Sequence, residues 1–214
     1  MVKVELINCP MDAECLCGRA AAECYQGNNP RKSVRVAVGS GHLSVLEHAH
    51  FTFRISGMSR VTLAQLTRHR MASYSVQSQR YCGVDPDWVV PQTVIDAGYK
   101  REYIAMCKAA HGLMEEMQEH GVPAEDARYI APQGVTCSLI MTMNARELHH
   151  FFSLRCCNRA QWEIREVARQ MLDLCRIAAA ELFREAGPGC VRGRCPEGKK
   201  ACGKPWKRVT DAET

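Results

Sequence analysis

Two stretches of the chain place apolar residues at every second position, and this alternation is the feature that most limits its fold. One runs from Val135 to Met143, and the other contains Phe51, Phe53 and Ile55. A period of two is typical of a strand with one buried face. Antiparallel sheets commonly have one packed face and one solvated face. The two stretches therefore predict strands of a small antiparallel sheet.

The rest of the chain favours helices. Apolar periodicity and turn residues predict helices over 12–26, 31–39, 60–70, 99–117, 145–155 and 161–185, a short helix that carries Arg128, and one more strand over 2–8. Asp12, Ser59 and Asn144 stand where N-cap residues belong. No Gly-rich fingerprint of a Rossmann or P-loop nucleotide site is present. We predict an α+β fold with a single catalytic domain over residues 1–186 and a basic tail over 187–214.

The hydropathy pattern predicts a cytoplasmic protein with no membrane partner. No apolar run reaches the roughly 18 residues that a membrane span needs. The first residues, Met-Val-Lys-Val-Glu-Leu, are too polar for a signal peptide.

Thirteen cysteines form no Cys-x-x-Cys pair. In a cytosolic chain, reduced thiols that serve as small apolar residues are the first expectation. The alternative is a zinc site built from Cys190, Cys195 and Cys202, for which the sequence offers no fourth local ligand. We expect no metal among the functional residues.

The net charge of +5 is concentrated near the C-terminus. Residues 187–208 contain seven Lys or Arg and one Glu, and residues 209–214 contain two acids. A basic tail suggests nucleic acid as a partner. Because Trp206 is its only aromatic residue, we favour a solvated or partner-ordered tail.

A window of 37 residues, His48 to Val84, contains five arginines and no Asp, Glu or Lys. Ser and Gln donors are interleaved with the arginines Arg68, Arg70 and Arg80. Guanidinium groups bind phosphate bidentately and stay charged. The window therefore predicts a binding site for an anionic ligand. Ser78 could act as a nucleophile only if a base reached it, and the sequence identifies none.

A second cluster lies near Arg155, which follows Phe151 and Phe152 on the predicted helix 145–155. A partly desolvated arginine needs an anionic or strongly polar partner. Glu163, Glu166 and a ligand remain open as that partner. His42 and His48 suit hydrogen bonding better than metal binding.

These segments resemble the flavin-dependent thymidylate synthases. The signature of that family is Arg-His-Arg, seven residues and then Ser, and here it reads Arg68-His69-Arg70, 71–77 and Ser78. Further blocks match in order over about residues 2–186: Gly41-His42-x-Ser44, Glu47-His48, Phe51-Thr52-Phe53, Gln65, Asn144-Ala145-Arg146, Leu154-Arg155 and Ala160-Gln161-Trp162-Glu163.

The resemblance implies reductive methylation of dUMP to dTMP. Methylenetetrahydrofolate would give the carbon, NADPH would reduce a bound FAD, and the reduced flavin would give a hydride to the pyrimidine without a protein nucleophile. It also implies a homotetramer whose active sites are shared between subunits. The alternative function is a nucleic-acid-binding module that uses the arginine window and the tail.

The resemblance also implies roles for individual residues, at the positions that match the family's site. The matching FAD positions are Ser44, Arg68, His69, Arg70, Val76, Asn144, Arg146 and His150. The matching dUMP positions are Gln65, Arg68, Val76, Gln77, Ser78, Gln79, Arg80, Arg128 and Arg155. Of these, Arg155 matches the arginine that polarises the uracil ring, which makes it the expected catalytic residue.

The chain departs from the family at Ser75-Val76, where many members carry Asn-Glu. Val76 can contact flavin or nucleotide only through its backbone or by packing.

Overall fold

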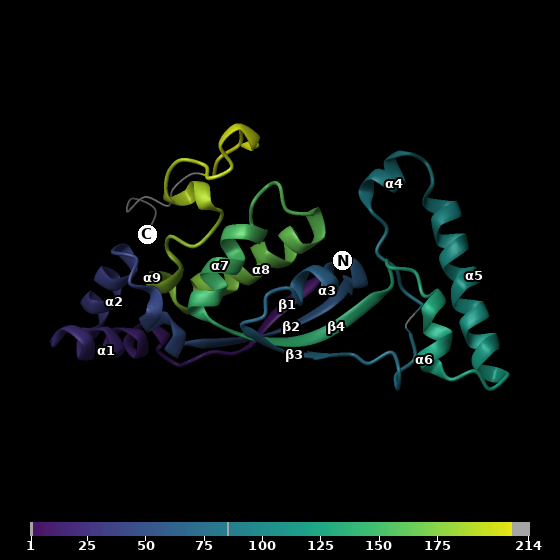
Figure 1. The fold of residues 1–214 in the computed structure, drawn as a ribbon, viewed down its shortest axis with the longest axis horizontal. Helices are drawn as coiled ribbons and strands as arrows, with labels where there is room; N and C mark the ends of the chain where they lie inside the picture. The colour runs from purple at the N-terminus through teal and green to yellow at the C-terminus, as the bar shows by residue number, and fades with distance from the viewer. Residues whose placement is uncertain (1, 85, 207–214) are drawn as a thin grey trace. The chain divides into compact units, whose positions relative to one another are not determined.

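A computed structural model describes residues 2–84 and 86–206 (Figure 1). The strands are β1 (Lys3–Asn8), β2 (His50–Ser59), β3 (Ala72–Val76) and β4 (Thr136–Asn144). The α-helices are α1 (Ala13–Tyr25), α2 (Pro30–Gly39), α3 (Arg60–Leu66), α4 (Gln92–Asp96), α5 (Lys100–Glu119), α6 (Ala124–Ala127), α7 (Ala145–Arg155), α8 (Trp162–Ala178) and α9 (Ala180–Phe183). The 3-10 helices are η1 (Leu43–His48), η2 (Arg128–Ile130), η3 (Gly189–Arg192) and η4 (Gly198–Lys200).

The four strands form one antiparallel sheet in the order β1-β2-β4-β3. The alternating residues behave as expected, because Phe51, Phe53 and Ile55 of β2 are fully buried. On β4, Leu139 and Met141 are buried in the same alternating pattern. The α+β class is therefore confirmed. Strand β3 is an addition, because no strand was predicted over Ala72–Val76.

The chain divides into two compact units. The first unit comprises residues 2–3, 55–68, 75–84 and 86–139, and the second comprises 4–54, 69–74 and 140–206. Every strand of the sheet has residues in both units. The expected boundary between a domain at 1–186 and a tail at 187–214 stays a prediction.

Capping side chains begin three helices where the sequence placed them. Asp12 accepts a hydrogen bond from the Cys15 amide at 2.8 Å, and Ser59 accepts one from the Thr62 amide. Asn144 accepts one from the backbone amide of Glu147 at 2.8 Å, so α7 starts directly after β4. Each cap satisfies an N–H group that has no partner within its helix.

Aromatic rings fill the core of the second unit. Phe183 of α9 meets Phe51 of β2 edge to face, with ring centroids 5.2 Å apart. The ring of Phe152 of α7 also packs against Phe183, with ring centroids 6.1 Å apart. The predicted helix 161–185 is wrong in one respect, because it is interrupted at Ala179 (φ −155°, ψ 73°). After this extended residue, α9 buries Leu182 and Phe183.

The tail packs on the second unit as far as the structure describes it. Arg192 donates a hydrogen bond to Nδ1 of His149 at 3.0 Å. The guanidinium of Arg169 lies over the ring of Trp206, 5.7 Å from its centroid. Residues 187–191 and Trp206 are buried or partly buried, whereas 192–194 and 196–205 are exposed, so the tail is anchored on the second unit but is largely solvated, as expected. Residues 207–214 lie outside the described part. No helix in the described ranges is long and apolar enough to cross a membrane.

Candidate functional site

The second unit buries His69 beside α7. The side chain of His69 is only 4% exposed, although it follows an exposed turn. Tyr74 of β3 donates a hydrogen bond to the His69 carbonyl at 2.8 Å. The ring of Phe151 packs edge to face against the imidazole, at 4.9 Å between centroids. Tyr74 of β3 and one face of α7 therefore fix the position of this histidine.

Both ring nitrogens of His69 have partners. Nε of Arg155 donates to Nε2 at 3.0 Å, and Nδ1 lies 3.3 Å from Oε1 of Glu147. A guanidinium can only donate, so Nε2 must be an acceptor and the proton sits on Nδ1. Burial, with the positive charges of Arg155 and His150, lowers the pKa of His69 to about 4. The imidazole is therefore neutral at pH 7.

Arg155 has in His69 a partner that the sequence did not suggest. Its position at the end of α7 puts it on the same face as Phe151 and Phe152, as the helical spacing predicted. The open choice among Glu163, Glu166 and a ligand did not include an imidazole. A neutral imidazole positions the guanidinium without neutralising its charge.

The remaining residues with expected flavin contacts in the second unit are mostly exposed. Ser44, Arg70 and His150 are all exposed, and His150 lies 6.0 Å from His69 between ring centroids. Arg146 forms a salt bridge with Glu47, in which both side chains are about half exposed. Asn144 uses its side-chain oxygen for the α7 cap, which leaves its amide as a donor.

Helix α3 is shorter than predicted, which corrects one part of the proposed site. It ends at Leu66, and the Thr67 hydroxyl donates to the Leu63 carbonyl at 3.1 Å. The predicted helix 60–70 therefore extends too far, and Gln65 shares no helix with Arg68 and His69. Arg68 and His69 belong instead to the turn that leads into β3.

The first unit holds most of the residues expected to contact dUMP. Gln77, directly after β3, donates its backbone N–H to the Ser138 carbonyl of β4 at 3.1 Å. The chain then turns, and the Ser78 hydroxyl accepts from the Arg80 amide at 3.3 Å. No base contacts the Ser78 hydroxyl within the described part of the chain, which suits a binding role for this serine. Val76 ends β3 and is partly buried.

The carboxylate-free window acquires carboxylates in the folded chain. Arg80 forms a salt bridge with Glu125 at 2.6 Å, and Arg54 lies 3.7 Å from Glu5. These two arginines therefore face acids in the folded chain, although no acid lies near them in the sequence. The sequence could not reveal the pairs because 45 residues separate Arg80 from Glu125.

A polar cavity of about 290 Å³ in the first unit brings together two residues assigned to dUMP. Gln79 and Arg128 both line it, and Arg128 is held by a hydrogen bond to the Glu125 carbonyl at 3.1 Å. Arg60, the first residue of α3, lines the same cavity. Arg60 was not assigned a role, although its place in the arginine window was a signal for one.

Within the described part of the chain, the two arginines of the Arg-His-Arg signature have no partner. Arg68 and Arg70 are exposed and make no hydrogen bond or ion pair with any residue in 2–84 or 86–206. These guanidinium groups can accept external anions without breaking an internal pair. Most residues assigned to flavin thus fall in the second unit, and most assigned to the nucleotide fall in the first.

The chain is similar to proteins of known activity. A family model described as thymidylate synthase complementing protein matches residues 5–179. A flavin-dependent thymidylate synthase of Geobacter sulfurreducens is 52% identical over 168 residues, which cover 77% of this chain and 72% of that protein. One from Clostridium tetani is 36% identical and covers 95% of this chain and 94% of its own.

A solved structure has a related fold. It is a UMP/dUMP methylase from Streptomyces cacaoi bound with 5-Br dUMP, with a TM-score of 0.76 and 24% sequence identity. The match covers 86% of this chain and 93% of the other. At this identity the likeness concerns the fold alone.

Proposed function

The chain belongs to the flavin-dependent thymidylate synthase family, and on this premise we propose that it converts dUMP to dTMP with FAD as its cofactor. The carbon comes from methylenetetrahydrofolate, and NADPH is the reductant. When bound and reduced by NADPH, FAD would supply the hydride for the reduction of the pyrimidine. Arg155 is the catalytic residue, because a fixed guanidinium stabilises charge that develops on the uracil ring.

The observation that carries the proposal is that Arg68 and Arg70 make no hydrogen bond or ion pair among the residues that the structure describes. Both FAD and dUMP bring phosphates, and guanidinium groups bind phosphates with charge-assisted hydrogen bonds. His69, between these arginines, is buried and neutral, so it adds no further charge. The signature thus provides two cations for external anions and one imidazole that positions Arg155.

The donor set of the second unit fits FAD. Arg70, His150 and Ser44 are exposed donors suited to a pyrophosphate and a ribose. Arg146 would exchange its exposed pair with Glu47 for a flavin phosphate at small cost, because exposed salt bridges contribute little. Val76 contributes through its backbone or by packing.

In the first unit, the turn Gln77–Arg80 provides the dUMP cradle, together with Arg128 and Gln65. Gln79 and Arg128 share one polar cavity with Arg60, and we add Arg60 to the groups that hold the nucleotide phosphate. Arg80 reaches the phosphate by leaving Glu125. Ser78 binds the nucleotide and does not attack it.

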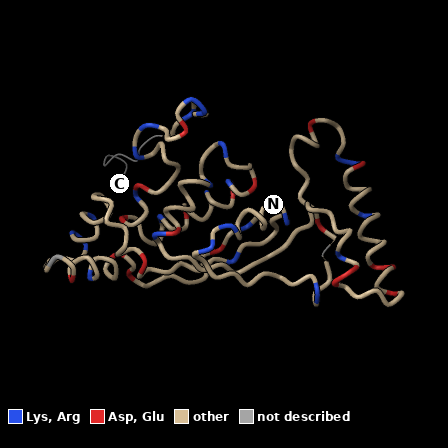
Figure 2. Tube along the Cα trace, viewed as in Figure 1, with Lys and Arg blue, Asp and Glu red and all other residues tan. Residues whose placement is uncertain are grey.

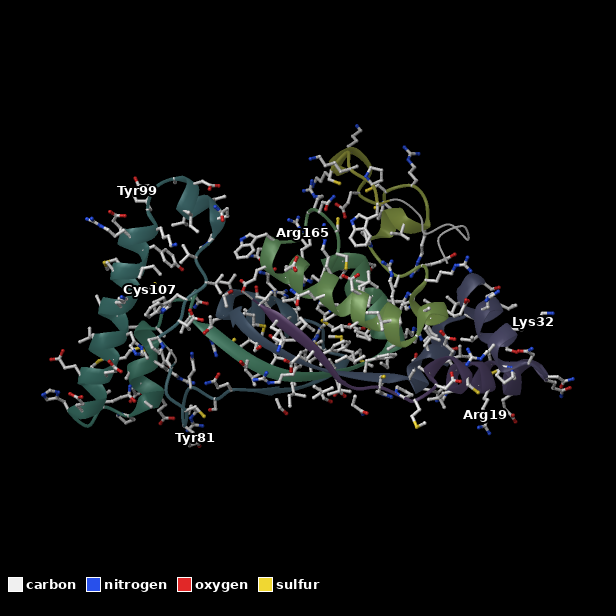
Figure 3. The ribbon with its side chains drawn as sticks, turned by 180° about the vertical axis from the view of Figure 1, so that it is seen from behind. Arg19, Lys32, Tyr81, Tyr99, Cys107 and Arg165 are labelled. Atoms are coloured by element: carbon white, nitrogen blue, oxygen red, sulfur yellow. The ribbon has the colours of Figure 1, made fainter. Side chains whose placement is uncertain are left out.

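Assembly into a homotetramer completes the proposal. Met106 and Leu113 of α5 are exposed, and so is Tyr99, the residue that precedes the helix. The three lie seven residues apart and hence on one face of the first unit's long helix (Figure 3 labels Tyr99 and Cys107). Large exposed apolar patches mark interaction sites. A second copy that covers this face would let the nucleotide residues of one chain meet the flavin residues of another. A cytoplasmic location stays a prediction.

The nucleic-acid alternative loses its main support in the tail. Trp206 is the single aromatic residue there, and Arg169 already covers its ring. Base stacking, which single-strand binding needs, would have to displace this contact.

Flavin spectroscopy tests the proposed function. Purified protein should show the spectrum of oxidised flavin or take up added FAD, and anaerobic NADPH should bleach it. Arg70→Ala should weaken FAD binding about tenfold, as expected for one charge-assisted hydrogen bond. Arg54→Ala, a second exposed arginine of the same unit, should leave it unchanged. A colourless protein that takes up no FAD would contradict the proposal.

A further inference from the structure

Four cysteines line one cavity of the second unit. The cavity has a volume of about 660 Å³ and lies between the α7–α8 loop and residues 188–206. Its thiols belong to Cys157, Cys190, Cys195 and Cys202, and none of the four forms a disulfide. Cys157 comes from the loop and the other three come from the tail, so residues that are far apart in the sequence line the same cavity.

We propose that these four cysteines bind one divalent metal ion that prefers thiolate ligands, with zinc as the ion that suits this set. Zinc binds four thiolates in a tetrahedron, and such sites are structural because no ligand position stays open. The three tail cysteines lacked a fourth local ligand in the sequence. Cys157 provides it.

Two of the sulfurs already accept backbone hydrogen bonds. The backbone amide of Lys204, two residues after Cys202, donates to Sγ of Cys202 at 3.4 Å. Gly203, between them, has a φ of +72°, a backbone conformation that favours glycine in such a turn. The Trp206 amide donates to Sγ of Cys190 at 3.5 Å. Donors of this kind stabilise metal-bound thiolates and orient them.

Charge around the cavity suits an anionic metal centre. Four thiolates and one Zn²⁺ carry a net charge of about −2. Arg159, Arg194 and Lys204 line the cavity, and Glu197 is the single acid among the lining residues. Figure 2 shows Lys and Arg gathered on this segment. The excess of basic residues in the tail thus has a use that needs no nucleic acid.

The thiols must move to close on the ion. Zn–S bonds of about 2.3 Å in a tetrahedron place the sulfurs about 3.8 Å apart. No three of the four sulfurs lie within 4.8 Å of one another. Within the described residues, the only three potential metal ligands that do so belong to His69, Glu147 and His150. That group is a poor metal site, because Nε2 of His69 already accepts from Arg155. Cysteine side chains can turn about χ1, and the tail carries glycines with positive φ next to them.

The metal would tie the tail to the end of α7. Cys157 follows Arg155 by two residues, and both line the cavity. The loop 156–161 between α7 and α8 is already held by Arg165, which is labelled in Figure 3. Its guanidinium donates to the Asn158 carbonyl at 2.7 Å. The inference does not depend on the proposed function, since the four thiols and the cavity stand without it.

Metal analysis tests the inference on the full chain, purified with a thiol reductant and without chelator. We expect about one zinc per chain by mass spectrometry of the elements. Cys157→Ser and Cys202→Ser should each lower the zinc content several-fold. Cys24→Ser and Cys82→Ser, which alter exposed thiols outside the cavity, should leave it unchanged. Cobalt added to the zinc-free chain should give a thiolate charge-transfer band and the visible bands of a tetrahedral ion.

Several results would overturn the inference. Reduced protein that contains no zinc and takes up neither zinc nor cobalt would do so. A zinc content that Cys157→Ser leaves intact would also exclude the four-cysteine site, and so would a thiol titration that finds two of the four cysteines joined in a disulfide. Circular dichroism of each variant separates loss of metal from loss of fold, and Cys202→Ser changes an exposed side chain and is the variant least able to disturb the core.

Discussion

Arg155 donates a hydrogen bond from its Nε to Nε2 of His69 at 3.0 Å, and this contact fixes both the protonation of the histidine and the direction of the arginine. The opposite ring nitrogen faces Glu147. The three side chains form a series in which a carboxylate orients an imidazole and the imidazole orients a guanidinium. The order matters because the guanidinium is the group proposed to act on the substrate.

Glu147 should therefore affect catalysis through His69. Glu147→Leu leaves the Nδ1–H of a buried imidazole without an acceptor, which costs about 1–3 kcal/mol. We expect kcat to fall about tenfold or more with a smaller change in KM for dUMP. Glu147→Gln retains an acceptor oxygen and should recover most of the rate. Equal rates for the Leu and Gln variants would remove Glu147 from the series.

Two buried histidines predict acid sensitivity. Burial, with Arg155 and His150 nearby, lowers the pKa of His69 to about 4. Burial is also the main reason that the pKa of His149 is lowered to about 4. Each group contributes stability above the pKa of about 6.5 in the unfolded chain, and this stability is lost as the pH falls towards 4.

Urea unfolding at several pH values measures this loss. We expect the free energy of unfolding to decrease by about 1–3 kcal/mol per histidine between pH 7 and pH 4. In His149→Gln the decrease should be smaller, because one titrating group is gone. An unchanged pH dependence in this variant would show that His149 does not titrate differently on folding.

Arg80 should matter for dUMP binding and not for flavin binding. Its exposed pair with Glu125 contributes little to stability, so Arg80→Ala should leave the melting temperature nearly unchanged. The dissociation constant for dUMP should rise about tenfold, because one charge-assisted contact to phosphate is lost. Arg101→Ala, an exposed arginine of the same unit, is the control. Equal dUMP affinity for both variants would contradict the role of Arg80.

The apolar face of α5 predicts an oligomer. Met106 is 71% exposed, and Met106→Glu places a charge in the middle of this face. We expect the wild-type chain to sediment as a tetramer and the variant to sediment as a smaller species. Lys108→Glu, also on α5, tests whether charge alone is responsible and should leave the tetramer intact. A monomeric wild-type chain would refute the shared active site.

The sequence predicted those parts of the fold that depend on local pattern. The alternation on β2 and β4 and the caps at Asp12, Ser59 and Asn144 act over a few residues, and they were read correctly. The end of α3 at Leu66 was missed because no Gly or Pro follows it. Strand β3 was missed although Ala72, Tyr74 and Val76 alternate with serines, because it is only five residues long and contains no strongly apolar run.

The residues of the candidate site were likewise predictable only where they lie close together in the sequence. The residues of the Arg-His-Arg signature were found because they are close in the sequence and match a family motif. The bond between His69 and Arg155 and the pair of Arg80 with Glu125 join residues far apart in the chain, and only tertiary packing brings them together. Cys157 was likewise separated from the tail cysteines until the fold placed them around one cavity.

Formation of dTMP is the most direct test of the central claim. Wild-type protein with FAD, NADPH and methylenetetrahydrofolate should convert dUMP to dTMP, and omission of FAD from the FAD-free protein should abolish the product. Arg155→Ala should keep its flavin and form dTMP about 100-fold more slowly, which corresponds to about 3 kcal/mol of lost transition-state stabilisation. An FAD-loaded wild type that forms no dTMP, or an Arg155→Ala variant with the wild-type rate, would contradict the account.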